Sequence, residues 1–292
     1  MKRPPLIRLI LILIALCGIV VWYGCGCDGT DQKASQIRIG GTDCWLSAKR
    51  TPPTKVIEEA ESMVQQYERN LSEEGAESQI AKINLAAGQR PIQVDAQVIE
   101  ILKKSMNYAR LSDGRYDPSS APLYELWENR SGESRALQRT TIHSVLEQVD
   151  FRRIRMSEGV RQVFLPDEGM RISMHPGVDG YIVDKVAERV QSQGVADVCV
   201  SKGIVRRAIN GNSQYTFAEE LLYENGKEKS GYVVTLKNLK SRALATLYAR
   251  EHLLINLNTG FPVENGLVCL VSAGPEAYAA EVLAFTVADR KS

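Results

Sequence analysis

The side chains best placed to do chemistry lie in residues 111–127, LSDGRYDPSSAPLYELW. The turn formers Ser112-Asp113-Gly114 interrupt a helical pattern, and Pro118 restricts Asp117 to an extended backbone. Helical spacing resumes at residues 123–127. The pattern predicts a rigid loop that holds a carboxylate between two helices, and such loops often carry binding groups. An ordinary helix–loop–helix corner, with Asp117 as an N-cap, is the alternative.

The composition excludes some classes of function. The chain has 292 residues, of which 44% are hydrophobic and 24% charged, with a formal net charge of +1. These values predict a globular protein with a sizeable core. No basic cluster follows the first few residues, so the electrostatic pattern of a nucleic-acid-binding protein is absent from the sequence. We therefore expect no nucleic-acid partner.

The N-terminus resembles an export signal. Lys2, Arg3 and Arg8 precede sixteen uncharged residues, 9–24, in the order of a basic n-region and an apolar h-region. This stretch is slightly shorter than the 17 to 25 apolar residues of a typical membrane span. Gly24-Cys25 resembles a lipoprotein cleavage site, so a cleaved signal, an uncleaved helix and a lipid anchor all stay open. We expect residues 1–27 to be a signal or anchor and 28–35 a linker. The protein is then membrane-associated in a bacterial cell envelope, on the periplasmic side.

The cysteines and histidines of the body form no recognisable ligand spacing. The three body cysteines are odd in number and widely spaced, which argues against a disulfide framework and favours buried thiols: Cys44, Cys199 and Cys269. The histidines are also scattered, which argues against a zinc site: His143, His175 and His252.

The pattern of apolar residues and turns predicts an α+β fold with a mixed sheet flanked by helices. A strand over residues 36–48 is interrupted at Gly40-Gly41-Thr42. Helices are expected at 54–70, 95–112 (with Asp95 as its cap), 141–149, 180–193 and 275–287. Strands are expected at 153–156, 160–165, 195–200, 205–210, 232–236, 243–246, 253–257 and 267–272. We take residues 36–292 as one domain.

Six landmarks in this order resemble those of a known family. They are Gly41-Thr42, residues 71–72 with 78–84 (LS and SQIAKIN), the loop 113–127, residues 180–184 (GYIVD), Ala245-Thr246 and residues 258–262 (NTGFP). Their order and spacing are similar to those of the ApbE-type flavin transferases over about residues 36–287. The resemblance implies a flavin-transferase-like fold.

The resemblance also implies a reaction. Members of the family are magnesium-dependent FAD:protein FMN transferases, which split FAD and attach FMN through its phosphate to a Ser or Thr of a partner protein. FAD and Mg2+ are thus the implied cofactors, and a flavin-acceptor membrane protein is the implied partner. The family's magnesium ligands are a loop carbonyl and an Asp and Thr one helical turn apart. Here those positions hold Pro176, Glu281 and Phe285, and Thr286 is displaced by about 100° around the helix.

Other functional positions carry over with changes. Asp179 also has a simpler interpretation, as the cap of a helix that starts at Gly180. The family's catalytic histidine matches His252 only after a shift of one place. Lys202-Gly203 replaces a glycine pair, and Ser173 and Asn256 replace aspartates. The flavin-contacting positions implied by the resemblance are Gly41, Thr42, Arg115, Tyr116, Asp117, Asp179, Gly180 and Thr246.

Three functions are compatible with these residues. The first is an active transferase with altered ligands. The second is a catalytically impaired relative that binds flavin or a partner protein at the membrane surface, and the third is a structural envelope domain. For the flavin readings we expect one cleft formed by Asp117, Asp179 and Glu281.

Overall fold

The computed structural model describes residues 35–39, 41–48, 50–128, 138–209, 215–219, 232–236, 243–248, 252–263 and 269–288. The predicted export or anchor segment, residues 1–27, and nearly all of the linker lie outside these ranges. Within them, no helix combines the length and apolar character needed to cross a membrane.

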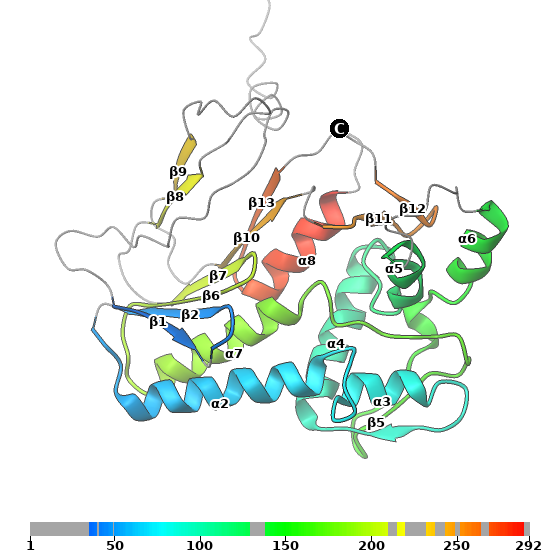
Figure 1. Ribbon diagram of the computed structural model, residues 1–292, viewed down its shortest axis with the longest axis horizontal. Helices are drawn as coiled ribbons and strands as arrows, with labels where there is room; N and C mark the ends of the chain where they lie inside the picture. Colours follow the sequence, from blue (N-terminus) through cyan, green and yellow to red (C-terminus); the bar gives the residue numbers. More distant parts are fainter. Residues whose placement is uncertain are drawn as a thin grey trace, which may run out of the picture.

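The largest sheet has six strands in the order β1-β2-β6-β7-β10-β13 (Figure 1). Its strands pair antiparallel throughout, so the prediction of a mixed sheet is wrong for this sheet. For the pairs β1–β2 and β6–β7 the antiparallel direction follows from the short turns that join their strands, because parallel pairing needs a long crossover. The strands are β1 (Ser35–Ile39), β2 (Cys44–Ala48), β6 (Val198–Lys202), β7 (Val205–Ile209), β10 (Ala243–Tyr248) and β13 (Cys269–Gly274).

Three helices pack in layers on this sheet: α2 (Thr54–Leu71), α7 (Val178–Ser192) and α8 (Ala277–Ala288) (Figure 1). Helices α7 and α8 contact the strands and each other, and α2 contacts α7. Side chains of α8 are buried around most of its circumference, as expected for a helix between two apolar cores. One core lies between α2, α7, α8 and the sheet, and the second joins α7 and α8 to the helical part of the chain.

The helical part contains α3 (Gln79–Leu85), α4 (Ala96–Leu111), α5 (Ala121–Glu128), α6 (Arg139–Leu146) and the 3-10 helix η1 (Phe151–Arg153). A small sheet has the order β3-β5-β4, with β3 (Ile92–Gln93), β4 (Arg155–Ser157) and β5 (Gln162–Phe164). Two further antiparallel pairs are β8 (Tyr215–Glu219) with β9 (Tyr232–Leu236) and β11 (Ile255–Asn256) with β12 (Phe261–Pro262). The class α+β, with helices flanking the strands, is confirmed.

Several local predictions are confirmed, including Asp95 as the N-cap residue of α4, and the cap predicted at Asp179 is wrong. The helices predicted at 54–70 and 95–112 are α2 and α4, and Cys44 and Cys199 are buried thiols outside any disulfide. Asp95 stands at the N-cap of α4, yet its carboxylate accepts from the side chains of Gln79 (2.6 Å) and Asn70 (3.3 Å) instead of the helix. Helix α7 starts at Val178, so Asp179 lies in its first turn and is not its cap.

Candidate functional site

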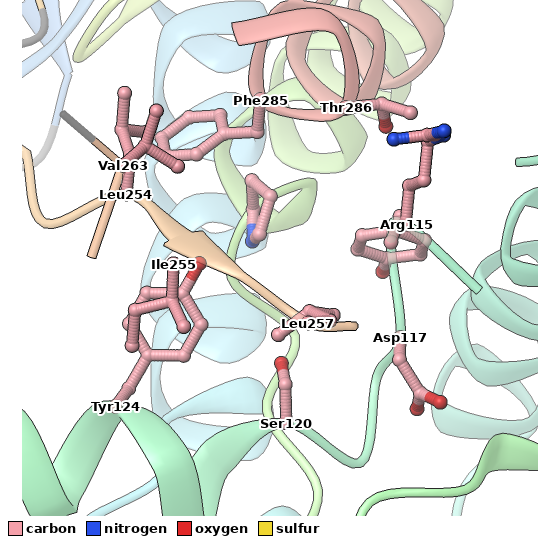
Figure 2. Close-up of a pocket in the computed structure, with 12 residues that line it drawn as sticks. Arg115, Asp117, Ser120, Tyr124, Leu254, Ile255, Leu257, Val263, Phe285 and Thr286 are labelled. Carbon is pink, nitrogen blue, oxygen red and sulfur yellow. The ribbon is translucent and has the colours of Figure 1, made fainter. Parts of the chain in front are cut away.

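A small cavity lies between the loop after α4, Pro176 in the loop before α7, the β11–β12 hairpin and α8 (Figure 2). Its volume is about 20 Å³, which holds a water molecule but no flavin. Five of the predicted site residues line it: Arg115, Tyr116, Asp117, Pro176 and Thr286. The rest of the wall is Ser120, Tyr124, Leu254, Ile255, Leu257, Val263 and Phe285.

The loop that carries Asp117 is rigid for identifiable reasons. The backbone turns at Asp113 (φ 54°) and Gly114 (φ 75°), where the left-handed conformation favours glycine. The side chain of Asp117 is 5% exposed, and its carboxylate accepts from Ser119 N (2.7 Å), Ser119 Oγ (2.6 Å) and Phe151 N (3.0 Å). Burial raises the pKa of this carboxyl, and the three hydrogen bonds oppose that rise. The carboxylate therefore fastens the loop to η1.

A wider groove lies on the other side of this loop. It has a volume of about 360 Å³ and shares Asp117 and Leu257 with the cavity. Volumes of a few hundred Å³ are typical of small-molecule sites. The groove is lined by Ala109, Arg110, Asp113, Gly114, Asp117, Val149, Asp150, Phe151, Arg152, Leu257 and Asn258.

Asp179 belongs to a separate cluster around Lys202. The Lys202 side chain is 9% exposed, and its ammonium bonds to Asp43 and lies 3.0 Å from Glu68 Oε1 and 3.6 Å from Asp179 Oδ1. Burial by itself lowers the pKa of Lys202, but these carboxylates outweigh it and hold the pKa above its ordinary value. The lysine predicted to stand in place of a family glycine is thus bound by three acids of its own chain.

Gly41 and Thr42 shape the β1–β2 turn next to this cluster. Gly41 has a φ of 74°. Thr42 N donates to Ile39 O (3.0 Å), and Thr42 Oγ1 accepts from Cys44 N (3.1 Å). The turn presents Asp43 to Lys202. Neither Gly41 nor Thr42 lines the cavity described above, and their contact with a flavin stays a prediction.

Gly180 and Asp184 join α7 to α8. A Cβ added at Gly180 would lie 2.6 Å from backbone atoms of Ala277, so only glycine permits this close approach. The Asp184 carboxylate accepts from Ala277 N (2.7 Å) and Tyr278 N (3.0 Å) and so caps the N-terminus of α8. The described contacts of Gly180 are therefore between helices, and its predicted flavin contact stays untested.

The predicted magnesium ligands do not form an oxygen-rich site. Glu281 is 1% exposed and accepts from Gly180 N at 2.6 Å. Burial, and then the charge of Asp179, raise the pKa of Glu281 to about 8, which disfavours its carboxylate form. Phe285 offers no ligand atom, and Thr286 Oγ1 donates to Val282 O (2.6 Å). Within the described ranges no group of three or more His, Cys, Asp or Glu side chains is arranged for a metal. The residues present do not fit a magnesium ion held by hard oxygen ligands.

We expected Asp117, Asp179 and Glu281 to form one cleft. Asp117 lines this cavity, but Asp179 and Glu281 do not. Thr246 does not line it either. It lies in β10, where its N–H donates to Ile204 O (3.0 Å). Asp179, Thr246 and Glu281 lie far from Asp117 along the chain, and the sequence does not show which face of its helix or strand each residue occupies.

His252 lies beside the cavity. Its ring and that of His175 both contact Phe285, edge to face, with centroids 5.6 and 5.0 Å away. The two histidine rings are stacked with centroids 6.5 Å apart. His252, which matches the family's histidine after a shift of one place, thus lies next to a cavity wall. Its catalytic role stays a prediction.

Several wall residues and partners were missed from the sequence. Tyr124 lies in the helix that was expected after the loop, and Leu254 and Ile255 lie in the strand expected at 253–257, but nothing in their types marks them as lining residues. The sequence also did not indicate the hydrogen-bond partner of Ser173. Ser173, which stands where the family has Asp, donates through its hydroxyl to the carboxylate of Glu73.

Comparisons with known proteins agree on one family. The model of the ApbE family matches residues 40–288. The chain is 23% identical over 304 residues to an FAD:protein FMN transferase of Treponema pallidum (strain Nichols), covering 95% of this chain and 83% of that protein. It is also 23% identical over 210 residues to an FAD:protein FMN transferase of Klebsiella pneumoniae (strain 342), covering 70% and 66%.

Solved structures share the fold. The flavin transferase ApbE from Vibrio cholerae superimposes with a TM-score of 0.74 at 17% identity, covering 89% of this chain and 87% of that one. The apo form of the Pseudomonas stutzeri flavinyl transferase ApbE gives 0.73 at 17% identity, covering 89% and 84%. The ApbE protein from Thermotoga maritima MSB8 gives 0.71 at 19% identity, covering 89% and 88%.

Proposed function

The chain belongs to the ApbE family, and from that premise we propose that it transfers FMN from FAD to a serine or threonine hydroxyl of a partner protein. The observation that carries the proposal is the family match over residues 40–288, because this range contains every residue that lines the cavity. Two relatives that cover most of this chain are named FAD:protein FMN transferases, which supports the same reaction.

The reaction exchanges the phosphoanhydride bond of FAD for a phosphate ester bond to the acceptor. The acceptor oxygen attacks the phosphorus that bears the riboflavin part, the bond to the second phosphate breaks, and AMP leaves. Such transfers depend mainly on positioning and on neutralising phosphate charge. We assign charge neutralisation to Arg115, which lines the cavity and can form paired hydrogen bonds with phosphate oxygens. His252, whose ring contacts Phe285 in the wall, is a group that can accept the hydroxyl proton.

We assign the flavin to the cavity together with the adjoining groove, which meet at Asp117 and Leu257. The cavity has to widen for this, because it holds only about 20 Å³. Hairpin β11–β12 is the wall that brings Leu257 to the site, and Trp127 Nε1 ties α5 to this hairpin through Gly260 O (2.8 Å). No step is assigned to magnesium, since the described residues do not fit it.

The place of action follows from the N-terminal sequence. We propose that residues 1–27 direct the chain out of a bacterial cytoplasm and hold it at the periplasmic side of a membrane. The acceptor would then be a membrane protein that exposes a serine or threonine on the same side. The basic start and the uncharged stretch that follows it support this proposal.

A second function is favoured by one specific observation. Glu281 is buried and accepts the N–H of Gly180 where the family resemblance implies a metal-binding carboxylate, and Phe285 replaces the neighbouring hydroxyl ligand. Groups that act together in catalysis tend to fail together when several are changed. Flavin or partner binding without transfer is therefore the alternative.

One experiment distinguishes these two functions. The full chain in detergent is incubated with FAD and an acceptor protein that a characterised family member modifies, with Mg2+, Mn2+ or Zn2+ in parallel. Covalent FMN on the acceptor, found by mass spectrometry, and released AMP, found by chromatography, would establish transfer. FAD binding without either product would establish flavin binding without transfer. Absence of FAD binding would contradict both transfer and flavin binding and would leave only the partner-binding form of the alternative.

A variant pair tests the assigned cation. Arg115→Ala is expected to weaken FAD binding about tenfold or more, because it removes a charged partner of the diphosphate. Arg90→Ala removes an exposed arginine outside the cavity wall and is the matched control. Equal FAD affinity of the two variants, measured by the quenching of flavin fluorescence, would refute the role of Arg115.

A further inference from the structure

Asn84 is a polar side chain on a helix face that otherwise belongs to the core. In α3 it follows Ile80 and Ile83 at helical spacing, and these two are 0% and 1% exposed while Asn84 itself is 8% exposed. A buried carboxamide needs hydrogen-bond partners, because leaving it without them costs free energy. The helix that presents it is held at its start by Ser78, whose hydroxyl accepts from Ala81 N (3.2 Å).

The partner of Asn84 is the backbone of one distant residue, Ile172. The amide nitrogen Nδ2 donates to Ile172 O (2.9 Å), and Oδ1 accepts from Ile172 N (2.8 Å). A neighbouring antiparallel strand would bond to Ile172 in the same paired way. The side chains of Met170, Ile172 and Met174 are all buried in the core of the helical part. The carboxamide thus takes the place of a strand along residues 170–174.

The other edge of residues 170–174 holds the loop of Asp117. Ser173 N donates to Pro118 O (2.8 Å), and Arg171 forms a parallel β-bridge with Ser120. Asp117 and Ser120 line the cavity (Figure 2). One side of this segment therefore bonds to α3 through Asn84, and the opposite side supports a wall of the cavity.

We propose that Asn84 is a positioning residue for the flavin site, and this inference rests on the proposed function. Asn84 does not line the cavity and acts through Ile172. The segment that it fixes supports the loop of Asp117 on one side and leads along the chain to Pro176, which lies in another part of the wall. The carboxamide therefore sets how these two parts of the wall lie relative to each other. Supporting hydrogen bonds of this kind keep the groups of a site in their productive geometry.

The test compares FAD affinities of full chains in detergent, measured by the quenching of flavin fluorescence. Asn84→Ala leaves the N–H and C=O of Ile172 without buried partners and should weaken FAD binding about tenfold or more. Val64→Ala is the matched control, because it removes buried atoms from the core between α2 and the sheet. It should lower the melting temperature but leave the FAD affinity unchanged, which separates positioning from a general loss of stability.

A second variant guards against loss of folding, which circular dichroism reports. Asn84→Asp keeps the shape of the side chain and an acceptor for Ile172 N, but its carboxylate cannot donate to Ile172 O. It should also weaken FAD binding. Parent-like FAD affinity in the folded variants of Asn84 would overturn the proposal.

Hydrogen exchange followed by mass spectrometry locates the effect without FAD. In Asn84→Ala, but not in Val64→Ala, the amides of residues 116–120 and 170–176 should exchange about tenfold faster than in the parent. A parent chain that binds no FAD would contradict the proposed flavin binding, and the exchange data then decide the positioning alone. Unchanged exchange at residues 116–120 in Asn84→Ala would overturn it, and faster exchange there would support it.

Discussion

At the scale of single residues, burial decides the protonation of Glu281. The carboxyl group lies between α7 and α8, accepts the N–H of Gly180 and has a pKa of about 8. In the unfolded chain the pKa returns to near 4.5, the ordinary value. The folded state therefore binds a proton that the unfolded state releases between these two values. The contribution to stability is complete below about pH 4.5 and is lost as the pH rises through about 8.

Replacing Glu281 with glutamine should flatten the pH dependence of stability. Glu281→Gln keeps an oxygen that can accept from Gly180 but cannot ionise, so the free energy of unfolding should fall less between pH 5 and 8.5. The difference is about 1.4 kcal/mol for each unit of pKa shift removed. Urea unfolding at several pH values measures it, with Glu58→Gln on the exposed face of α2 as control. The same slope in both variants would show that Glu281 is not the group responsible.

At the scale of elements, α7 and α8 form the centre of the molecule. Their close approach depends on Gly180, and the first turn of α8 is capped by Asp184 of α7. The same carboxylate accepts from Arg207 of β7 at 2.8 Å. One side chain thus joins two helices and a strand, and it aligns α8, which carries Phe285 and Thr286 into the cavity wall.

Removing this cap should destabilise the fold. Asp184→Ala leaves two backbone N–H groups and the Arg207 guanidinium without their buried acceptor, and it should lower the free energy of unfolding by about 2–4 kcal/mol. Glu188→Ala removes the other, half-exposed partner of Arg207 and should cost under about 1 kcal/mol. Denaturant unfolding at pH 7 compares them. Equal losses would mean that the helix cap contributes little.

At the scale of the whole molecule, the Lys202 cluster ties distant parts together. It joins the β1–β2 turn through Asp43, α2 through Glu68, α7 through Asp179 and β6 through Lys202 itself. The ammonium balances carboxylates that would otherwise repel one another within a partly buried space. The ion pairs tie the end of the interior strand β6 and the β1–β2 turn to α2 and α7, where the family resemblance implies an approach to flavin.

Neutralising Lys202 should make stability depend more strongly on pH. In Lys202→Met the carboxyl of Asp179 loses the cation that lowers its pKa, so the variant should be nearly as stable as the parent at pH 4. It should be less stable by about 1–3 kcal/mol at pH 7. Lys103→Met breaks an exposed ion pair with Glu158 and should have almost no effect. Thermal melts from pH 4 to 8 test this, and a constant loss across that range would contradict it.

Local features could be read from the sequence because they depend on neighbours along the chain. The loop around Asp117, the helices α2 and α4 and the turn between β1 and β2 arise from turn formers, proline and apolar periodicity. The short strands β3 and β11 could not be delimited, since two paired residues leave no periodic pattern. The family itself was predicted from ordered landmarks, and the match over residues 40–288 confirms it.

The sequence by itself thus determined the class of fold, the family and the rigid loop. Only the tertiary structure decided that the strands pair antiparallel, that Lys202 is surrounded by Asp43, Glu68 and Asp179, and that His175 lies beside His252. Those outcomes depend on which faces of α2, α7 and α8 meet when two cores are packed. Contacts between residues far apart in the chain, together with burial, then set the charge of groups such as Glu281.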